Sequence, residues 1–168
     1  MWDRKIILFY YLLKALQTVA ATPGCIILYM DTDSVIYSHP ELIDPLPTGP
    51  HIGDLTDECK GKRILEYGSA GCKNYAIEYE ENGEIKHILK IRGFPLDSNA
   101  CESIHYKTFI EKTLNFGIDL EPIVVSYSNC LRPNLKHGTV YTISQTKKYR
   151  PVISKGVVVG NDVITYGY

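Results

Sequence analysis

The feature that most constrains this chain is an apolar run that ends in two closely spaced aspartates. Residues 25–30 are continuously apolar, which is the pattern of a short buried strand. The next four residues predict a turn: Asp31, Thr32, Asp33 and Ser34. Residues 35–37 resume a strand so soon that the two strands can pair only antiparallel, because parallel strands need a long crossover between them. The sequence therefore predicts a hairpin with two carboxylates at its tip.

The rest of the chain predicts an α+β fold with mostly antiparallel pairing. Residues 4–20 lack Gly and Pro and favour a helix. A second helix is expected over residues 100–115, with Asp97, Ser98 or Asn99 as its N-cap. The pair Asn82-Gly83 is a strong hairpin signal between two alternating runs. Strands are expected over residues 64–67, 72–80, 84–91, 123–127, 139–144 and 152–159.

The N-terminal segment and the cysteines argue against a membrane or secreted protein. Residues 6–16 are apolar and resemble a weak signal peptide. Lys14 interrupts this run, which is also too short to cross a bilayer, so we expect an amphipathic or buried helix and no membrane partner. The five cysteines are odd in number and include no C-x2-C pair, so neither a disulfide framework nor a zinc site is predicted. A reducing compartment is expected.

Charge is distributed unevenly along a chain of ordinary globular composition. The 168 residues are 45% hydrophobic, and 13 tyrosines favour β-rich structure. The formal net charge of −1 argues, as an average, against nucleic-acid binding. However, residues 31–120 carry 9 basic and 16 acidic side chains, whereas residues 121–168 carry 6 and 2. An acidic centre is thus followed by a basic tail.

Two carboxylates at a tight turn can hold a divalent cation against phosphate oxygens. Mg²⁺ commonly takes only one or two protein carboxylates and completes its shell with phosphates and water. The alternative is a turn in which Asp only closes the hairpin. An EF-hand loop starting at Asp31 is excluded, because its sixth and twelfth positions hold Ile36 and Leu42 in place of Gly and Glu.

A haloacid-dehalogenase-type phosphatase is a second interpretation. Its motif, an apolar strand followed by D-x-D-x-[TV], is satisfied by residues 31–35. In that family the first Asp, here Asp31, is the nucleophile, and the second, here Asp33, is the general acid and base. The family also needs crossover helices between its strands, whereas this sequence predicts hairpins. The residues 53–54 (Gly-Asp) follow too soon to be its late acidic motif.

The hairpin most closely resembles motif C of family B DNA polymerases. That motif reads Y-x-D-T-D-S, and residues 29–34 match it contiguously. Lys73 and Tyr75 resemble the K-x-Y motif of the protein-primed branch and follow at the expected distance. Segments 53–58, 67–72, 89–94, 147–150 and 166–168 also resemble this branch. The resemblance covers nearly the whole chain and points to polymerases of linear plasmids, adenovirus-like viruses and Polinton or Maverick transposons.

The resemblance implies a role for each matching residue. Asp33 would be the main metal ligand and Asp31 its supporting acid. Two hydroxyl residues would shape the turn: Thr32 and Ser34. Lys73 and Tyr75, which alternation places on one face of a strand, would contact the primer–template. Basic residues of the tail would meet the phosphate backbone, although each also suits a solvated surface: Arg132, Lys136, Lys147, Lys148, Arg150 and Lys155.

The implied architecture is the C-terminal part of a polymerase. Residues 1–92 would form the second half of the palm, an antiparallel sheet with packed helices, and residues 93–168 a small mixed α/β-hairpin thumb. Motif A (D-x2-S-L-Y-P) and motif B (K-x3-N-S-x-Y-G) are absent, and only 30 residues precede Asp31. Transfer of a nucleotide from a dNTP to the primer 3′-hydroxyl would use two Mg²⁺ ions. Holding both ions would need carboxylates from motif A as well as from motif C.

Three functions follow as expectations. The first is DNA-directed DNA polymerase activity in replication, with a terminal protein as a candidate primer and a missing N-terminal polymerase region as a partner. The isolated chain is then expected to be inactive. The second is the phosphatase that uses Asp31 and Asp33. The third is a non-catalytic remnant whose salt-dependent DNA binding needs the basic tail and is insensitive to Asp33.

Overall fold

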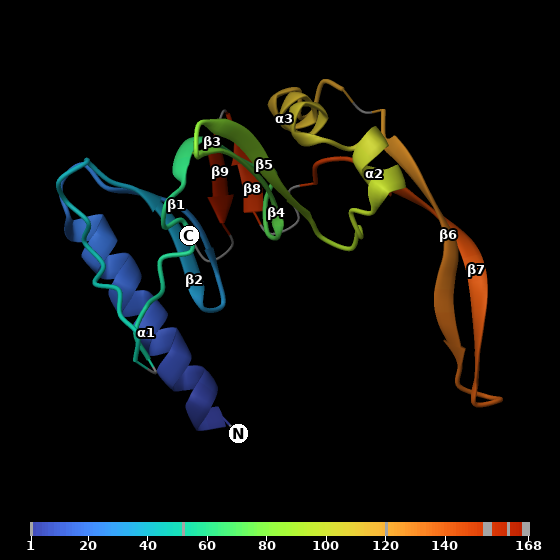
Figure 1. The fold of residues 1–168 in the computed structure, drawn as a ribbon, viewed down its shortest axis with the longest axis horizontal. Coiled ribbons are helices and arrows are strands. Elements are labelled where there is room, and N and C mark those ends of the chain that lie inside the picture. The colour runs from blue at the N-terminus through green and yellow to red at the C-terminus, as the bar shows by residue number, and fades with distance from the viewer. Residues whose placement is uncertain (1, 52, 120, 153–155, 161, 166–168) are drawn as a thin grey trace. The chain divides into compact units, whose positions relative to one another are not determined.

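A computed structural model describes the chain except for residues 1, 52, 120, 153–155, 161 and 166–168 (Figure 1). The fold is α+β, and every pair of named strands in it is antiparallel, as predicted. The chain divides into two compact units, Met1–Gly61 and Lys62–Tyr168. The expected functional boundary between palm and thumb, at residues 92 and 93, stays a prediction.

The first unit consists of a helix and a hairpin. Helix α1 spans Trp2–Ala21, which confirms the predicted helix, and it is followed by strands β1 (Ile26–Asp31) and β2 (Ser34–Ser38). Its small core is made by Ala15, Val19 and Leu46, with Val35 and Tyr37 of β2 packed against them. Among the described residues, no helix has both the length and the apolar character needed to cross a membrane.

Strand β1 is not the buried strand that its apolar sequence predicts. Ile26 is 62% exposed and Met30 is 54% exposed. The reason is topological: β1 pairs with β2 in a two-stranded sheet, no other described strand pairs with it, and α1 covers one face of that hairpin. A continuous apolar run predicts burial only where other elements cover both faces of the strand.

The second unit begins with a three-stranded sheet in the order β3-β4-β5. Its strands span Arg63–Ser69, Asn74–Glu81 and Glu84–Ile91. Asn82 and Gly83 join β4 to β5 with φ values of 55° and 79°. Two consecutive positive φ angles are the geometry that matches the right-handed twist of a hairpin, so the hairpin predicted from this pair is confirmed.

The single helix predicted over residues 100–115 is wrong, because two helices occupy this region. Helix α2 spans Ser98–Ser103 and α3 spans Tyr106–Leu114. Ile104 and His105 between them are extended, and Ile104 is fully buried while the His105 side chain caps α3. The expected N-cap is confirmed for α2, where the Asp97 side chain accepts a hydrogen bond from the Ala100 N–H at 2.9 Å.

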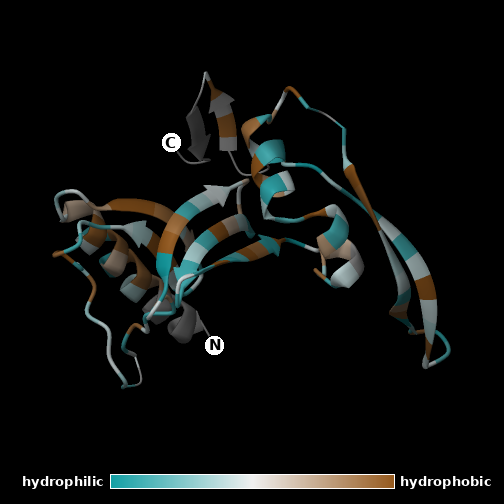
Figure 2. Ribbon diagram, turned by 45° about the horizontal axis from the view of Figure 1, so that its top comes forward, coloured by the Kyte–Doolittle hydropathy of each residue, from teal (hydrophilic) through white to brown (hydrophobic). Residues whose placement is uncertain are grey.

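A long two-stranded ribbon and a short hairpin complete the second unit. Strands β6 (Ile123–Asn134) and β7 (Thr139–Tyr149) are both longer than predicted. Bands of hydrophobic and hydrophilic residues follow one another along this ribbon (Figure 2). Within the stretch 152–159, for which a strand is predicted, the structure describes strand β8 (Gly156–Val159), which pairs with β9 (Asp162–Thr165); residues 153–155 lie outside the described residues.

The core of the second unit lies between its sheet, its helices and the base of the ribbon. Phe109 of α3 stacks on Tyr149 of β7 with ring centroids 5.9 Å apart. Val125 and Tyr127 of β6 are buried in the same cluster, with Ala76 of β4. This cluster therefore joins residues on both sides of position 92.

Candidate functional site

The two aspartates lie at the tip of the β1–β2 hairpin, as predicted. Asp31 is the last residue of β1 and pairs with Ser34, so that Thr32 and Asp33 form a two-residue loop. The Asp33 N–H donates to the Asp31 carbonyl oxygen at 2.5 Å. Thr32 has a φ of 46°, which is a left-handed conformation that β-branched residues rarely adopt. The loop thus holds a strained backbone of the kind that clusters at functional sites, at a cost of roughly 1–3 kcal/mol.

Side-chain hydrogen bonds also close this loop. The Thr32 hydroxyl donates to a carboxylate oxygen of Asp31 at 3.1 Å. The Ser34 hydroxyl donates to the Asp31 carbonyl oxygen, also at 3.1 Å. These are the contacts that a turn-shaping role for Thr32 and Ser34 requires.

Asp31 lies on the face of the hairpin that points away from helix α1. Val35 and Tyr37 pack against the core, so alternation along β2 places Ser34 and Ile36 on the opposite face. Asp31 is the cross-strand partner of Ser34 and shares that face. Asp31 is half-buried, whereas Asp33 in the loop is exposed.

The two aspartate carboxylates are too few to bind a cation by protein ligands alone, so they suit a cation that also binds water and phosphate oxygens. Among the described residues, no group of three or more His, Cys, Asp or Glu side chains is arranged to hold a metal ion. Mg²⁺ needs no such group, because it usually keeps several waters and binds one or two carboxylates together with substrate phosphates. Asp31 and Asp33 supply oxygen donors of the type that Mg²⁺ takes, two positions apart at the tip of the hairpin.

Lys73 does not share a strand face with Tyr75, so that prediction is wrong. Strand β4 begins at Asn74, whose N–H donates to the Gly71 carbonyl at 3.0 Å and closes a turn. Lys73 lies in that turn with a φ of 61° and is exposed. Tyr75 is half-buried in β4, with its ring 6.1 Å from that of Tyr67. The aspartates lie in the first unit, and Lys73 and Tyr75 in the second.

The basic residues of the tail fall into two groups. Lys147 is half-buried, and its ammonium donates to the Gly93 carbonyl. The same ammonium lies 5.6 Å from the centroid of the Phe94 ring and 5.3 Å from that of Tyr127. Contacts of this kind hold a cation within the protein. Four other basic residues are exposed: Arg132, Lys136, Lys148 and Arg150.

Alternation explains why Lys147 and Lys148 differ. Successive side chains of a strand point to opposite faces. Tyr149 is buried, so Lys147 shares the core face of β7, and Lys148 points to solvent. The role expected for Lys147 in DNA binding stays a prediction, and Lys155 and residues 166–168 lie outside the described residues.

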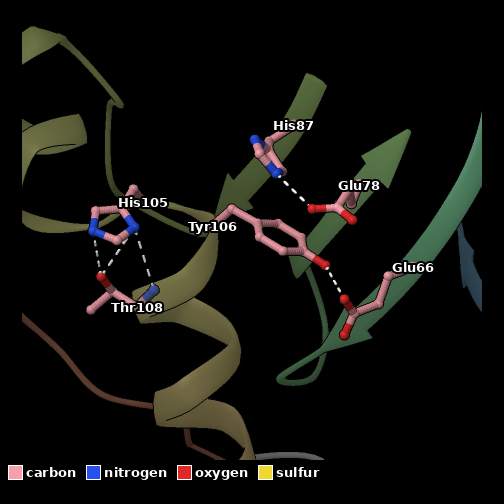
Figure 3. A network of polar contacts seen from close by, with 6 residues as sticks. All are labelled: Glu66, Glu78, His87, His105, Tyr106 and Thr108. Atoms are coloured by element: carbon pink, nitrogen blue, oxygen red, sulfur yellow. Dashed lines mark hydrogen bonds and ion pairs between the residues drawn. The ribbon is translucent and has the colours of Figure 1, made fainter. Parts of the chain in front are cut away.

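A polar network that the sequence analysis missed joins α3 to the sheet (Figure 3). The Tyr106 hydroxyl donates to a Glu66 carboxylate oxygen at 2.7 Å, and Tyr106 stacks on His87 with centroids 4.4 Å apart. The His87 Nε2 lies 2.9 Å from a Glu78 carboxylate oxygen. Burial, followed by the hydrogen bond to Glu66, raises the pKa of the Tyr106 hydroxyl.

The register of the sheet creates this network. Glu66, Glu78 and His87 are successive cross-strand partners in β3, β4 and β5. Their proximity could be found from the sequence only with the register of three strands already known. The network fastens Tyr106, and with it the first turn of α3, onto the sheet.

Comparisons with known proteins provide no relative for this chain. No protein-family model, no curated protein and no solved structure matches it. The functional argument therefore depends on the residues and geometry of the chain itself.

Proposed function

We propose that this chain is the palm and thumb portion of a protein-primed family B DNA polymerase. Its chemistry is nucleotidyl transfer from a dNTP to the 3′-hydroxyl of a DNA primer during replication. The observation that carries this proposal is the β1–β2 hairpin, which holds residues 29–34, in the order Y-x-D-T-D-S, as strand, tip and strand. Asp31 with Ser34 already closes this turn, so turn formation alone does not explain a second aspartate, Asp33, in the strained two-residue loop.

In this proposal the hairpin supplies part of a metal site. Asp33 is exposed in the loop and can reach a bound ion, while Asp31 is fixed by its bond from Thr32. When bound, Mg²⁺ supplies positive charge at the reacting phosphates. The carboxylate of motif A and the nucleotide-gripping residues of motif B belong to the missing N-terminal polymerase region, so we expect no polymerisation by this chain alone.

The ribbon supports a role for the second unit in holding DNA. No acidic residue occurs between Glu121 and Asp162, a segment that includes all of β6 and β7. Exposed cations along such a surface neutralise phosphates and release counterions. Lys148 and Arg150 are the exposed members at the base of the ribbon, and Arg132 and Lys136 lie at its far end.

The phosphatase is the weaker alternative for the same two aspartates. Its nucleophile sits at the end of a parallel strand in a core with crossover helices. Here the strand that bears Asp31 turns back immediately into β2. The alternative predicts hydrolysis of a generic phosphomonoester that is lost in Asp31→Asn.

Two assays on the purified chain test the proposal. Binding of a labelled primer–template, followed by fluorescence anisotropy, is expected to weaken with salt. The double variant Lys148→Gln/Arg150→Gln should reduce the slope of log K against log salt by about 2, since each phosphate contact contributes nearly one unit. The double variant Lys60→Gln/Lys107→Gln removes two exposed lysines elsewhere and should leave the slope unchanged.

Primer extension with Mg²⁺ or Mn²⁺ is the second assay, and no product is expected from this chain. Template-dependent extension that disappears in Asp33→Asn would contradict the expected inactivity while supporting the family assignment. Absence of DNA binding, or phosphatase activity that depends on Asp31, would overturn the proposal.

A further inference from the structure

The far half of the β6–β7 ribbon carries an arginine and a tyrosine side by side on one face. Arg132 and Tyr141 are cross-strand partners, so their side chains point to the same side of the ribbon. Tyr149, which is buried at the base of the ribbon, lies on this side too, because alternate residues of β7 share a face. The ribbon extends away from α2 (Figure 1). Arg132 is exposed and Tyr141 is 49% exposed, so both side chains face solvent.

The Tyr141 ring is open to a ligand. Within the part of the chain that the structure describes, no aromatic ring or cation packs on it, and its hydroxyl makes no hydrogen bond. The tyrosines at the base of the ribbon differ. Tyr149 stacks on Phe109, and the Tyr127 hydroxyl donates to the Pro95 carbonyl oxygen at 3.0 Å. Tyr141 therefore contributes to no core contact of this kind, and its flat apolar face can stack on another flat group.

The guanidinium of Arg132 is held in place and keeps most of its donors. Its Nη2 donates to the side-chain oxygen of Gln145 at 3.1 Å. Gln145 lies further along β7 toward the base of the ribbon, so the guanidinium points away from the Tyr141 ring and leaves it uncovered. A guanidinium has several N–H donors, and this bond uses one of them. No acidic residue occurs between Glu121 and Asp162, so no carboxylate of the ribbon competes for the others.

We infer that Arg132 and Tyr141 bind one nucleotide of single-stranded DNA, with its base on the Tyr141 ring and its phosphate at the Arg132 guanidinium. Every charged side chain of β6 and β7 is basic, which favours a polyanion, and the open ring favours a polyanion whose units carry flat bases. A duplex fits less well, because its bases already stack on one another, whereas an unpaired base offers its face to an aromatic side chain. The inference rests on the proposed function, in which the unpaired part of the template supplies this strand.

Fluorescence anisotropy with a labelled oligo-dT and with a blunt DNA duplex tests this inference on the full chain. Tyr141→Leu should weaken binding of oligo-dT about tenfold, because it removes the stacked ring, and should leave binding of the duplex unchanged. Tyr141→Phe keeps the ring and should bind oligo-dT as the wild type does. Val140→Ala changes an exposed position on the opposite face and is the matched control, with normal binding of both ligands expected. Arg132→Gln should reduce the slope of log K against log salt for oligo-dT by about 0.7.

The outcomes separate this inference from the proposed function. A chain that binds neither ligand contradicts both. A chain that binds the duplex but not oligo-dT, or a Tyr141→Leu variant that binds oligo-dT with wild-type affinity, contradicts the inference and leaves the proposed function standing. Equal weakening of both ligands by Tyr141→Leu also contradicts it, since that result indicates a disturbed ribbon. Tighter binding of oligo-U than of oligo-dT, lost in Tyr141→Leu, would assign the site to RNA and overturn the choice of DNA.

Discussion

Replacing Tyr106 by Phe tests how α3 is held on the sheet. The change removes only the hydroxyl that donates to Glu66 at 2.7 Å, from a side chain that is 8% exposed. A hydrogen bond to a charged acceptor contributes about 1.5–3 kcal/mol. Glu66 is exposed and regains water when the bond is lost, so we expect the lower end of this range. At pH 8 the free energy of unfolding should fall by about 1.5 kcal/mol.

The same substitution has a defined pH dependence. The pKa of Tyr106 is raised in the folded state by burial and by Glu66. An unfolded tyrosine ionises near pH 10, so the stability contributed by the folded hydroxyl is complete below pH 10 and is lost as pH rises further. The wild type should lose about 1.4 kcal/mol per pH unit from this residue above pH 10, whereas the Phe variant loses none. The two proteins should therefore become equally stable about one pH unit above this ionisation, near pH 11.

Urea denaturation followed by circular dichroism, repeated at several pH values, measures both effects. Tyr141→Phe is the matched control, because Tyr141 is 49% exposed, and it should change stability by no more than a few tenths of a kcal/mol. Wild-type stability in Tyr106→Phe at pH 8 would refute the reasoning. So would a difference between the two proteins that stays constant from pH 8 to pH 11.

Three further substitutions have expected outcomes. Tyr149→Phe should leave the urea midpoint unchanged or raise it, because the Tyr149 hydroxyl is buried without a hydrogen-bond partner among the described residues; a loss above about 1 kcal/mol would reveal a partner. Lys73→Gln should weaken primer–template binding in anisotropy titrations, because it removes an exposed cation, and unchanged binding would contradict a primer contact at this position. Lys147→Met should lower the free energy of unfolding by about 1–2 kcal/mol, because it removes the aromatic and carbonyl contacts of the ammonium. It should also reduce DNA affinity less than Lys148→Gln does. A larger loss of DNA affinity in Lys147→Met than in Lys148→Gln would assign Lys147 to DNA binding.

Local signals in this sequence predict its local structure well. The Asn82-Gly83 turn, the Asp97 cap and the helix at residues 4–20 each depend on a few neighbouring residues, and all three are present. The aspartate hairpin is likewise encoded by an apolar run, a turn and a second run.

The errors arise where distant contacts decide the outcome. The helix over residues 100–115 breaks because burying Ile104 in the core and capping α3 with His105 outweigh continued helix formation. The apolar sequence of β1 cannot reveal that only one face of its hairpin is covered. Lys147 is held by Gly93 and Phe94, which are more than fifty positions away, and no local pattern indicates such a contact.

Metal binding at the hairpin tests the central claim most directly. Mn²⁺ bound to the chain in the presence of primer–template and dNTP can be measured by electron paramagnetic resonance. We expect Mn²⁺ binding beyond that of the nucleic acid and nucleotide alone, and Asp33→Asn should weaken it about tenfold or more. Glu41→Gln removes another exposed carboxylate of the first unit and should have no effect. Equal binding by the wild type and Asp33→Asn, or none beyond the free components, would contradict the account.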